Sequence, residues 1–172
     1  LKELTESAGA EVINTITQTL DKHSNTYLGK GKLLEIKEYL DINQINTVIC
    51  DDELTPNQQL NLETSLGQKI KVLDRTSLIL DIFASRANSM EGKLQVELAQ
   101  HEYLLPRLAG QWTHLERLGG GIGTRGPGES QIETDRRLAR NRINLLKSKL
   151  EKVKAHRQRY RSKRKSSGIP TI

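Results

Sequence analysis

The sequence contains few cysteines, few aromatic residues and no long apolar run, and each shortage excludes a class of protein. Its one cysteine, Cys50, can form neither an internal disulfide nor a cysteine-rich zinc site. Because no stretch of about 18 apolar residues occurs, we expect no membrane span, and the first residues lack the pattern of a signal peptide. Aromatic residues make up 3% of the chain, too few for a surface that stacks on unpaired bases. These features predict a cytoplasmic protein.

Charge is distributed unevenly along the chain, although the formal net charge is only +6. Residues 1–90 carry 9 Lys or Arg and 13 Asp or Glu, whereas residues 128–165 carry 14 basic and 4 acidic residues. A mildly acidic globular part is therefore joined to a strongly basic arm. Such a division is typical of proteins that contact nucleic acid or another anionic surface.

Residues 1–90 alternate between strand and helix patterns. The β-branched or apolar segments predict three strands, over residues 10–18, 46–52 and 69–74. The helical segments lie before and between them, at residues 1–7, 29–40, 54–67 and 75–87. Strands separated by about ten helical residues need crossover connections, which favour a parallel sheet. We therefore predict an α/β subdomain, a small parallel sheet with flanking helices, which lacks the first strand of its natural sheet.

The helix expected at 54–67 carries the clearest local signals. Thr55 is a favoured N-cap residue, Pro56 suits the first helical position, and Gln58 completes a T-x-x-Q capping box. Gly67 suits the end of the helix, because glycine readily adopts the backbone conformations that follow a last turn.

From residue 91 onwards, residues recur at the alternating steps of four and three that mark coiled-coil seams. The first seam is Leu94, Leu98, His101, Leu105, Leu108 and Trp112. The second seam is Ala139, Ile143, Leu146, Leu150, Val153, Arg157 and Tyr160. Two seams predict a long antiparallel two-helix hairpin over residues 91–165, with a glycine-rich tip loop at 109–130. Pro106 predicts a kink or an early end of the first helix, because proline removes a backbone donor.

Each seam contains one polar residue, His101 in the first and Arg157 in the second. Such residues mark either a place where the hairpin frays and admits water or a site that fixes the register of the two helices. The sequence leaves both interpretations open.

The tip contains the sequence GGGIGTRGPGES, in which Gly121, Gly123 and Gly126 have the spacing G-x-G-x-x-G. A dinucleotide site with that spacing needs a preceding strand within a βαβ unit, but helix and loop patterns precede it here. No Walker A sequence, G-x-x-x-x-G-K-[ST], occurs in the chain. Two interpretations remain: a flexible turn, or a loop whose backbone N–H groups approach phosphates while Arg117 and Arg125 supply positive charge.

Three acids, Asp51, Asp52 and Glu53, follow a predicted buried strand. Ligands often bind at the carboxyl edge of a parallel sheet, so the cluster allows a metal or acid–base site. The simpler interpretation is that the two aspartates end the strand and Glu53 leads into the Thr55 cap. No histidine or second acidic group has an evident reason to meet this cluster, so we favour the simpler one.

The segment KAHRQRYRSKRK, residues 154–165, is basic and follows the last acid of the chain, Glu151. Its charges cannot pair along a helix with acids four residues away. Phosphates would neutralise them, which favours nucleic acid over a merely solvated helix face. The low aromatic content then favours structured RNA that is bound through backbone and shape.

Longer sequence blocks resemble the HflX family of ribosome-associated GTPases, and the resemblance covers essentially the whole chain. The blocks are GKLQVELAQHEYLLPRL (92–108), GGGIGTRGPGESQIETDRR (119–137), TYLGKGKLLEI (26–36), DDELTPNQQLNLE (51–63) and DRTSLILDIFASRA (74–87). The resemblance implies an α/β subdomain at 1–90, a helical hairpin at 91–165, and a linker at 166–172 toward a GTPase domain that this sequence lacks. It places no catalytic residue in this chain, and GTP and Mg²⁺ are expected only for the full-length family.

The resemblance also implies partners: the protein would contact the large ribosomal subunit and its 23S rRNA during ribosome splitting or rescue. The residues that it implicates in RNA binding lie at the tip and on the second helix: Arg117, Gly119, Gly120, Gly121, Gly123, Arg125, Gly126, Gly128, Arg136, Arg137, Arg140 and Arg142. We expect a monomer that holds no metal and that, in the full-length protein, also contacts its own GTPase domain. The alternatives are a nucleotide-binding enzyme domain that uses the glycine-rich loop, and a structural coiled-coil adaptor.

Overall fold

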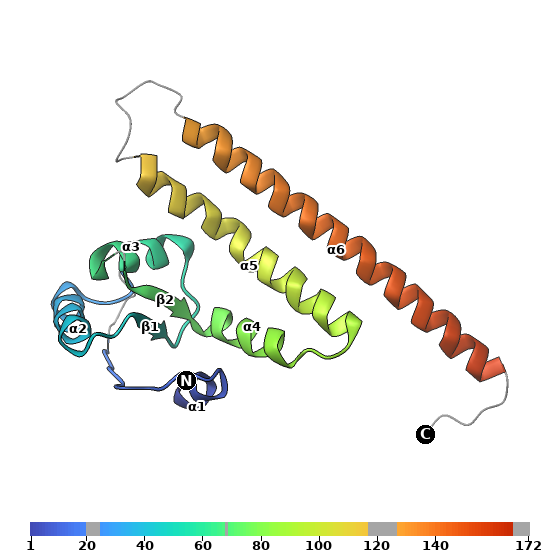
Figure 1. Ribbon diagram of the computed structural model, residues 1–172, viewed down its shortest axis with the longest axis horizontal. Helices are drawn as coiled ribbons and strands as arrows, with labels where there is room; N and C mark the ends of the chain where they lie inside the picture. The colour runs from blue at the N-terminus through green and yellow to red at the C-terminus, as the bar shows by residue number, and fades with distance from the viewer. Residues whose placement is uncertain (20–24, 68, 117–126, 167–172) are drawn as a thin grey trace.

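The chain forms a small α/β base and a long helical hairpin that lies beside it (Figure 1). The computed structural model describes residues 1–19, 25–67, 69–116 and 127–166 and, within these, the side chains outside residues 109–132. The base contains helices α1 (Lys2–Ser7), α2 (Lys30–Asn43), α3 (Pro56–Leu66) and α4 (Arg75–Arg86). The hairpin consists of α5 (Met90–Glu116) and α6 (Pro127–Ser166).

The sheet of the base is parallel, as the sequence predicts, and its described part has two strands. Strand β1 (Thr47–Cys50) pairs with β2 (Lys71–Asp74) so that Thr47 lies opposite Lys71 and Cys50 lies opposite Asp74. Helix α3 forms the crossover between them. Both strands therefore end at the same edge of the sheet, where α3 and α4 begin.

The strand predicted at 10–18 is wrong, because this segment is neither strand nor helix. A β-branched composition favours a strand only where a sheet edge and a buried face are available to it. Here Ile13 and Ile16 remain 54% and 37% exposed. The segment crosses the base without joining the sheet.

The core of the base lies between the sheet and helices α2 and α3. Its buried residues are Leu33, Ile36, Leu40, Cys50, Leu54, Leu62, Leu66 and Val72. Helix α3 has the predicted ends: the Thr55 side chain accepts from the Gln58 backbone N–H at 3.2 Å, and the Thr55 backbone N–H donates to the Gln58 side chain at 3.0 Å. Gly67 follows the last helical residue with a φ of 117°, a conformation that L side chains rarely adopt.

The hairpin is antiparallel and its seam is apolar, as predicted. Leu94, Leu146 and Leu150 are buried between α5 and α6, and Leu98 and Val153 pack against them. Helix α6 has 40 residues, which gives it a length of about 60 Å. No helix in the described part of the chain is both long enough and apolar enough to cross a membrane.

Two predictions about the hairpin need correction. An early end of the first helix is wrong: α5 continues past Pro106 to Glu116, because the proline is exposed and costs one helical hydrogen bond while neighbouring residues remain packed on the base and on α6. A kink at Pro106 stays a prediction. The tip loop is also shorter than 109–130, since residues 109–116 and 127–130 are helical. Pro127 is the first residue of α6, a position that proline tolerates well because its missing N–H would have no helical partner.

Candidate nucleic-acid interface

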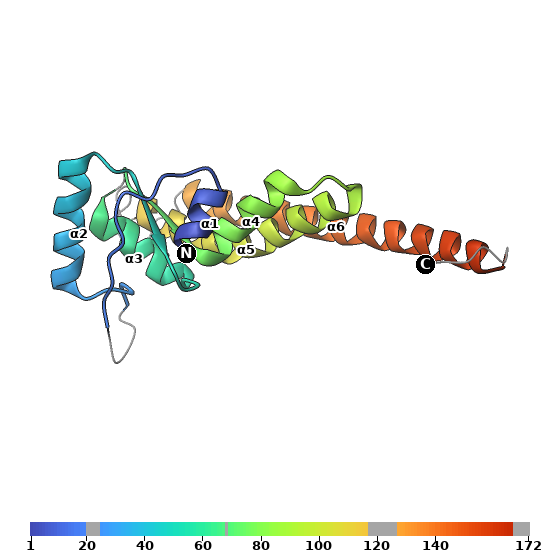
Figure 2. The same cartoon turned by 90° about the horizontal axis from the view of Figure 1, so that it is seen from below.

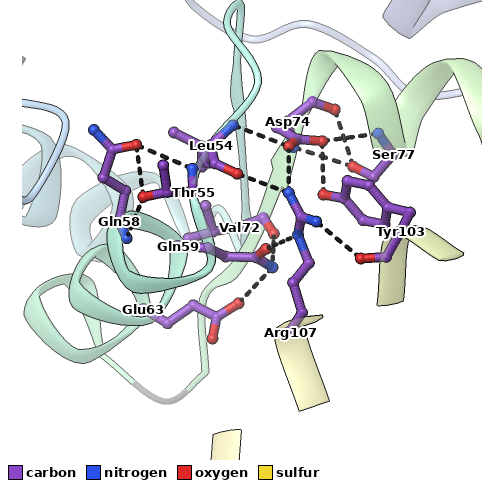
Figure 3. Close-up of polar contacts among 10 residues, drawn as sticks. All are labelled: Leu54, Thr55, Gln58, Gln59, Glu63, Val72, Asp74, Ser77, Tyr103 and Arg107. Atoms are coloured by element: carbon purple, nitrogen blue, oxygen red, sulfur yellow. Dashed lines mark hydrogen bonds and ion pairs between the residues drawn. The ribbon is translucent and has the colours of Figure 1, made fainter. Parts of the chain in front are cut away.

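A buried arginine on α5 joins the hairpin to the base (Figure 3). The guanidinium of Arg107 donates to the carbonyl oxygen of Leu54 at 2.7 Å and to the carboxylate of Asp74 at 3.3 Å. It also donates to Gln59 Oε1 at 3.1 Å and to the Tyr103 carbonyl oxygen at 2.8 Å. The side chains of Arg107 and Asp74 are 8% and 0% exposed. We call this set of five residues the junction.

Both carboxylate oxygens of Asp74 are satisfied. Oδ1 accepts from the Ser77 backbone N–H and from the Tyr103 hydroxyl, each at 2.8 Å, and Oδ2 accepts from the Leu54 N–H at 3.1 Å as well as from Arg107. Burial tends to raise the pKa of Asp74, but the hydrogen bonds from Ser77, Tyr103 and Leu54 outweigh it and hold the pKa below its usual value. Burial and the Asp74 carboxylate raise the pKa of the Tyr103 hydroxyl. At neutral pH the junction therefore holds a carboxylate, a neutral phenol and a guanidinium.

The junction fixes the direction in which the hairpin lies on the base. Asp74 ends β2 and caps α4, Leu54 lies just before α3, and Arg107 belongs to α5. Burying the charges of Arg107 and Asp74 is costly unless all their hydrogen-bond partners are in place. Only a few relative orientations of these elements meet that condition. The position of α6, which packs on α5, follows from this constraint.

The four arginines of α6 that the family resemblance implicates in RNA binding differ in their surroundings. Arg137, Arg140 and Arg142 are exposed and Arg136 is half-buried. Arg142 forms an ion pair across the hairpin with Glu97. For the other three, no ion pair with another described side chain is found, so their charges are available to an external anion.

The flank of the hairpin that includes Arg140 is hollowed. An open groove of about 310 Å³ lies between the two helices and is lined by Glu102, Leu105, Arg140, Ile143, Asn144 and Lys147. Lys147 and Glu102 form an ion pair across it at 2.8 Å. Because its charges are mixed, the groove lacks the single sign that a phosphate site needs.

The tip itself is not tested. Arg117, Gly119, Gly120, Gly121, Gly123, Arg125 and Gly126 lie outside the described residues. Gly128, which the sequence places in the loop, is the second residue of α6. The interpretation of the glycine-rich sequence as a phosphate-binding loop therefore stays a prediction.

Two of the three acids at the carboxyl edge of the sheet, Asp51 and Asp52, have structural partners. Asp51 forms an ion pair with Arg75, the first residue of α4, and Asp52 accepts from the Tyr27 hydroxyl at 2.8 Å. Within the described residues, no group of three His, Cys, Asp or Glu side chains is placed to hold a metal ion. Burial, helped by Asp74 and Asp52, raises the pKa of the Cys50 thiol to about 12. These contacts favour the structural interpretation of the acidic cluster over a catalytic one.

The two polar seam residues differ in their surroundings. Arg157 forms an ion pair with Glu91 near the start of α5, and its side chain is 71% exposed. His101 lies 3.9 Å from Glu97 and is one-third exposed. Both lie at the margin of the seam, where water reaches them, so neither is a buried residue that would fix the register.

The sequence alone does not reveal the junction, although Tyr103 and Arg107 lie in the block GKLQVELAQHEYLLPRL that carries the family resemblance. Three partners of Arg107, namely Asp74, Gln59 and Leu54, lie 33, 48 and 53 residues away in the chain, and no local pattern shows such contacts. The available signal was an arginine between the apolar positions Leu105 and Leu108, a place where a charged residue needs a partner.

Two family models match the chain and together span nearly all of it. One is described as the GTP-binding GTPase N-terminal region and matches residues 1–84. The other is described as the GTP-binding GTPase middle region and matches residues 86–164.

Among curated proteins, GTPase HflX of Caldanaerobacter subterraneus is 54% identical over 100% of this chain, and GTPase HflX of Escherichia coli K12 is 48% identical over 99% of it. The chain spans about 40% of the length of each relative. Among solved structures, a GTP-binding protein from Sulfolobus solfataricus in complex with GDP matches 88% of this chain and 40% of its own, with 30% identity and a TM-score of 0.62. These matches cover the base and the hairpin together.

Proposed function

Because the chain belongs to the HflX family of GTPases and matches its N-terminal and middle regions, we propose that it binds the large ribosomal subunit through 23S rRNA. The hairpin makes the contact, with the glycine-rich tip and the α6 arginines against the RNA. In the full-length protein this binding serves ribosome splitting or rescue in the cytoplasm.

The observation that carries this proposal is a set of arginines, on a hairpin whose orientation is fixed, for which no ion pair is found among the described side chains. Arg137 and Arg140 are exposed, Arg136 is half-buried, and the junction holds α5 to the base through Arg107. A fixed array of cations can match the phosphates of a folded RNA without losing much conformational entropy on binding. Each phosphate that is neutralised releases counterions, so the affinity falls steeply with salt.

The relatives supply the rest of the proposal. They are named GTPases, and this chain spans about 40% of their length. A Walker A sequence does not occur in the 172 residues, so the residues present do not fit a phosphate-binding site of that kind. We assign GTP and Mg²⁺ to the part of the relatives that this chain does not cover, and RNA binding to the part that it does.

Co-sedimentation of the chain with isolated large subunits over a salt series tests the proposal. The variant R136E/R137E/R140E reverses three arginines and leaves Arg142 with its partner Glu97. The matched control K30E/K37E/K71E reverses three exposed lysines of the base. We expect the arginine variant to lose binding at least tenfold and to show a lower salt slope. Equal binding by both variants contradicts the proposal.

A further inference from the structure

The C-terminal part of α6 extends beyond the rest of the molecule. Arg157 of α6 pairs with Glu91 at the beginning of α5, and α6 continues beyond this pair to Ser166. Figures 1 and 2 show from two directions that this end projects past α5 and the base. Every residue from 154 to 166 is exposed. We call residues 152–166 the basic end of α6.

The basic end carries eight Lys or Arg residues and no Asp or Glu. Nearer the tip, acids of α5 neutralise α6: Glu97 pairs with Arg142 and Glu102 pairs with Lys147. Within the basic end, Lys154 has Glu151 and Arg157 has Glu91. For most of its other cations, no acidic partner is found among the described side chains. Beyond Arg157, which pairs with Glu91 at the start of α5, helix α5 no longer runs beside α6.

Helix stability alone does not account for this charge. Basic residues in the last turn, Lys163 to Lys165, do favour the negative end of the helix dipole. Like charges four residues apart, as in Arg157–Arg161 and Arg161–Lys165, destabilise a helix instead. An anionic partner removes this repulsion.

The cations form two rows along the basic end. At 3.6 residues per turn, Lys154, Arg161 and Lys165 fall on one side of the helix. Lys152, Arg159 and Lys163 fall on the other. Between the rows, on the face turned away from α5, lie Ala155 and Ser162, which have short side chains, and Gln158, which is uncharged. A helix about 10 Å wide with a cation row on each side can lie along a groove of a double helix and reach the phosphates of both strands.

We infer that the basic end of α6 is a second RNA-binding surface, separate from the tip, and that its ligand is double-helical RNA. The inference rests on the proposed function and extends it to a site at the other end of α6. An unpaired strand fits less well, because the aromatic residues here, His156 and Tyr160, contact each other with ring centroids 4.5 Å apart and no further aromatic residue is available for stacking. A membrane fits less well, because the segment has no apolar face to insert.

Fluorescence anisotropy with a labelled RNA hairpin of about 20 base pairs, and with an unpaired RNA of equal length, tests the inference. The variant K152Q/R159Q/R161Q/K165Q removes two charges from each row and keeps helix-forming side chains. The control K30Q/K37Q/K69Q/K71Q removes four charges from exposed lysines of the base. We expect the row variant to bind the duplex at least tenfold more weakly, with a salt slope lower by about 3 to 4, and the control to change affinity less than twofold.

Two bulky substitutions test, without changing charge, whether the face between the two rows of cations contacts the RNA. Ala155→Phe places a large side chain between the rows, whereas Ala84→Phe places the same side chain on an exposed position of α4. We expect Ala155→Phe alone to weaken duplex binding about tenfold, while circular dichroism shows unchanged helix content for both variants.

The inference is overturned if the row variant binds the duplex as the control does, if the unpaired RNA binds as tightly as the duplex, or if anionic lipid vesicles bind the chain in preference to RNA. The duplex assay contains no ribosome, so its outcome is independent of large-subunit binding. If the chain sediments with large subunits through Arg136, Arg137 and Arg140 but does not bind the duplex, the proposed function is supported and this inference is contradicted. If the chain binds the duplex through the two rows of cations but does not bind large subunits, the proposed function is contradicted.

Discussion

The guanidinium of Arg107 lies 3.3 Å from the carboxylate of Asp74, and this buried ion pair connects the hairpin to the α/β base. The pair also carries the only side-chain charges that are buried in the described part of the molecule. Its hydrogen bonds extend to four further residues, Leu54, Gln59, Ser77 and Tyr103, so one cluster sets the orientation of the long hairpin on the base.

Replacing Arg107 by Met is expected to destabilise the protein by about 3–5 kcal/mol, because Asp74 is left as an uncompensated buried charge. Urea unfolding measures the loss. The matched control is Arg75→Met, which removes the exposed ion pair with Asp51 and is expected to cost less than about 1 kcal/mol. Equal losses in the two variants would show that the junction is not a strong constraint.

The junction also predicts a dependence of stability on acid. The pKa of Asp74 is lower in the folded chain than its ordinary value, so the unfolded chain binds the proton more tightly. The contribution of Asp74 to the free energy of unfolding is therefore complete above the pKa of about 3.9 that it has in the unfolded chain. This contribution is lost as pH falls through the pKa of the folded chain. We expect Asp74→Asn to be less stable at pH 7 and to lose less stability than the wild type between pH 5 and pH 2, roughly the interval of this titration. Parallel curves for the two proteins would refute this role.

The hairpin core depends on Leu146, which is 0% exposed, whereas its neighbour Leu145 is 46% exposed. Leu146→Ala is expected to destabilise the protein by about 2–5 kcal/mol, since it opens a cavity between α5 and α6. Leu145→Ala removes the same atoms from a largely solvated position and is expected to cost less than about 1 kcal/mol. Chemical denaturation distinguishes them, and similar values would contradict the observed seam.

The thiol of Cys50 is predicted to be unreactive in the folded protein. It is buried, and burial raises its pKa to about 12, so little thiolate exists at pH 8. Iodoacetamide is expected to modify the chain only after denaturant is added, as mass spectrometry would reveal. Rapid alkylation without denaturant would mean that the α/β base readily unfolds enough to expose Cys50.

Isothermal titration of the chain with GTP is expected to show no binding, because no Walker A sequence is present. The same titration with ATP and NAD tests the glycine-rich loop as an enzyme site. Micromolar binding of any of these nucleotides that is lost in Gly121→Ala or Gly123→Ala would overturn the assignment of the tip to RNA.

How far the sequence predicts the fold depends on the range of the interactions. The ends of α3 were predictable because Thr55, Gln58 and Gly67 act on their own helix. The seam of the hairpin was predictable because its period is local to each helix. The segment at 10–18 was not, since its β-branched residues could form a strand only beside a free sheet edge.

The same distinction applies to the candidate site. The basic character of α6 follows from charge density, which the sequence displays directly, whereas the four arginines named on it follow from the family resemblance. The junction does not, because Arg107 meets residues from β2 and from the segment before α3 only after the chain has folded. The continuation of α5 past Pro106 has the same origin, since contacts of Tyr103 and Arg107 with the base hold both sides of the proline in place.

The most direct test of the central claim is directed hydroxyl-radical probing of the large subunit. In a Cys50→Ser background, an iron chelate is attached through Arg137→Cys on the hairpin or, as a control, through Lys37→Cys on α2. The account predicts cleavage of 23S rRNA from position 137 that is strong at low salt and lost at high salt, with weaker cleavage at other sites from position 37. Absence of rRNA cleavage from position 137, in a protein that still folds, would contradict it.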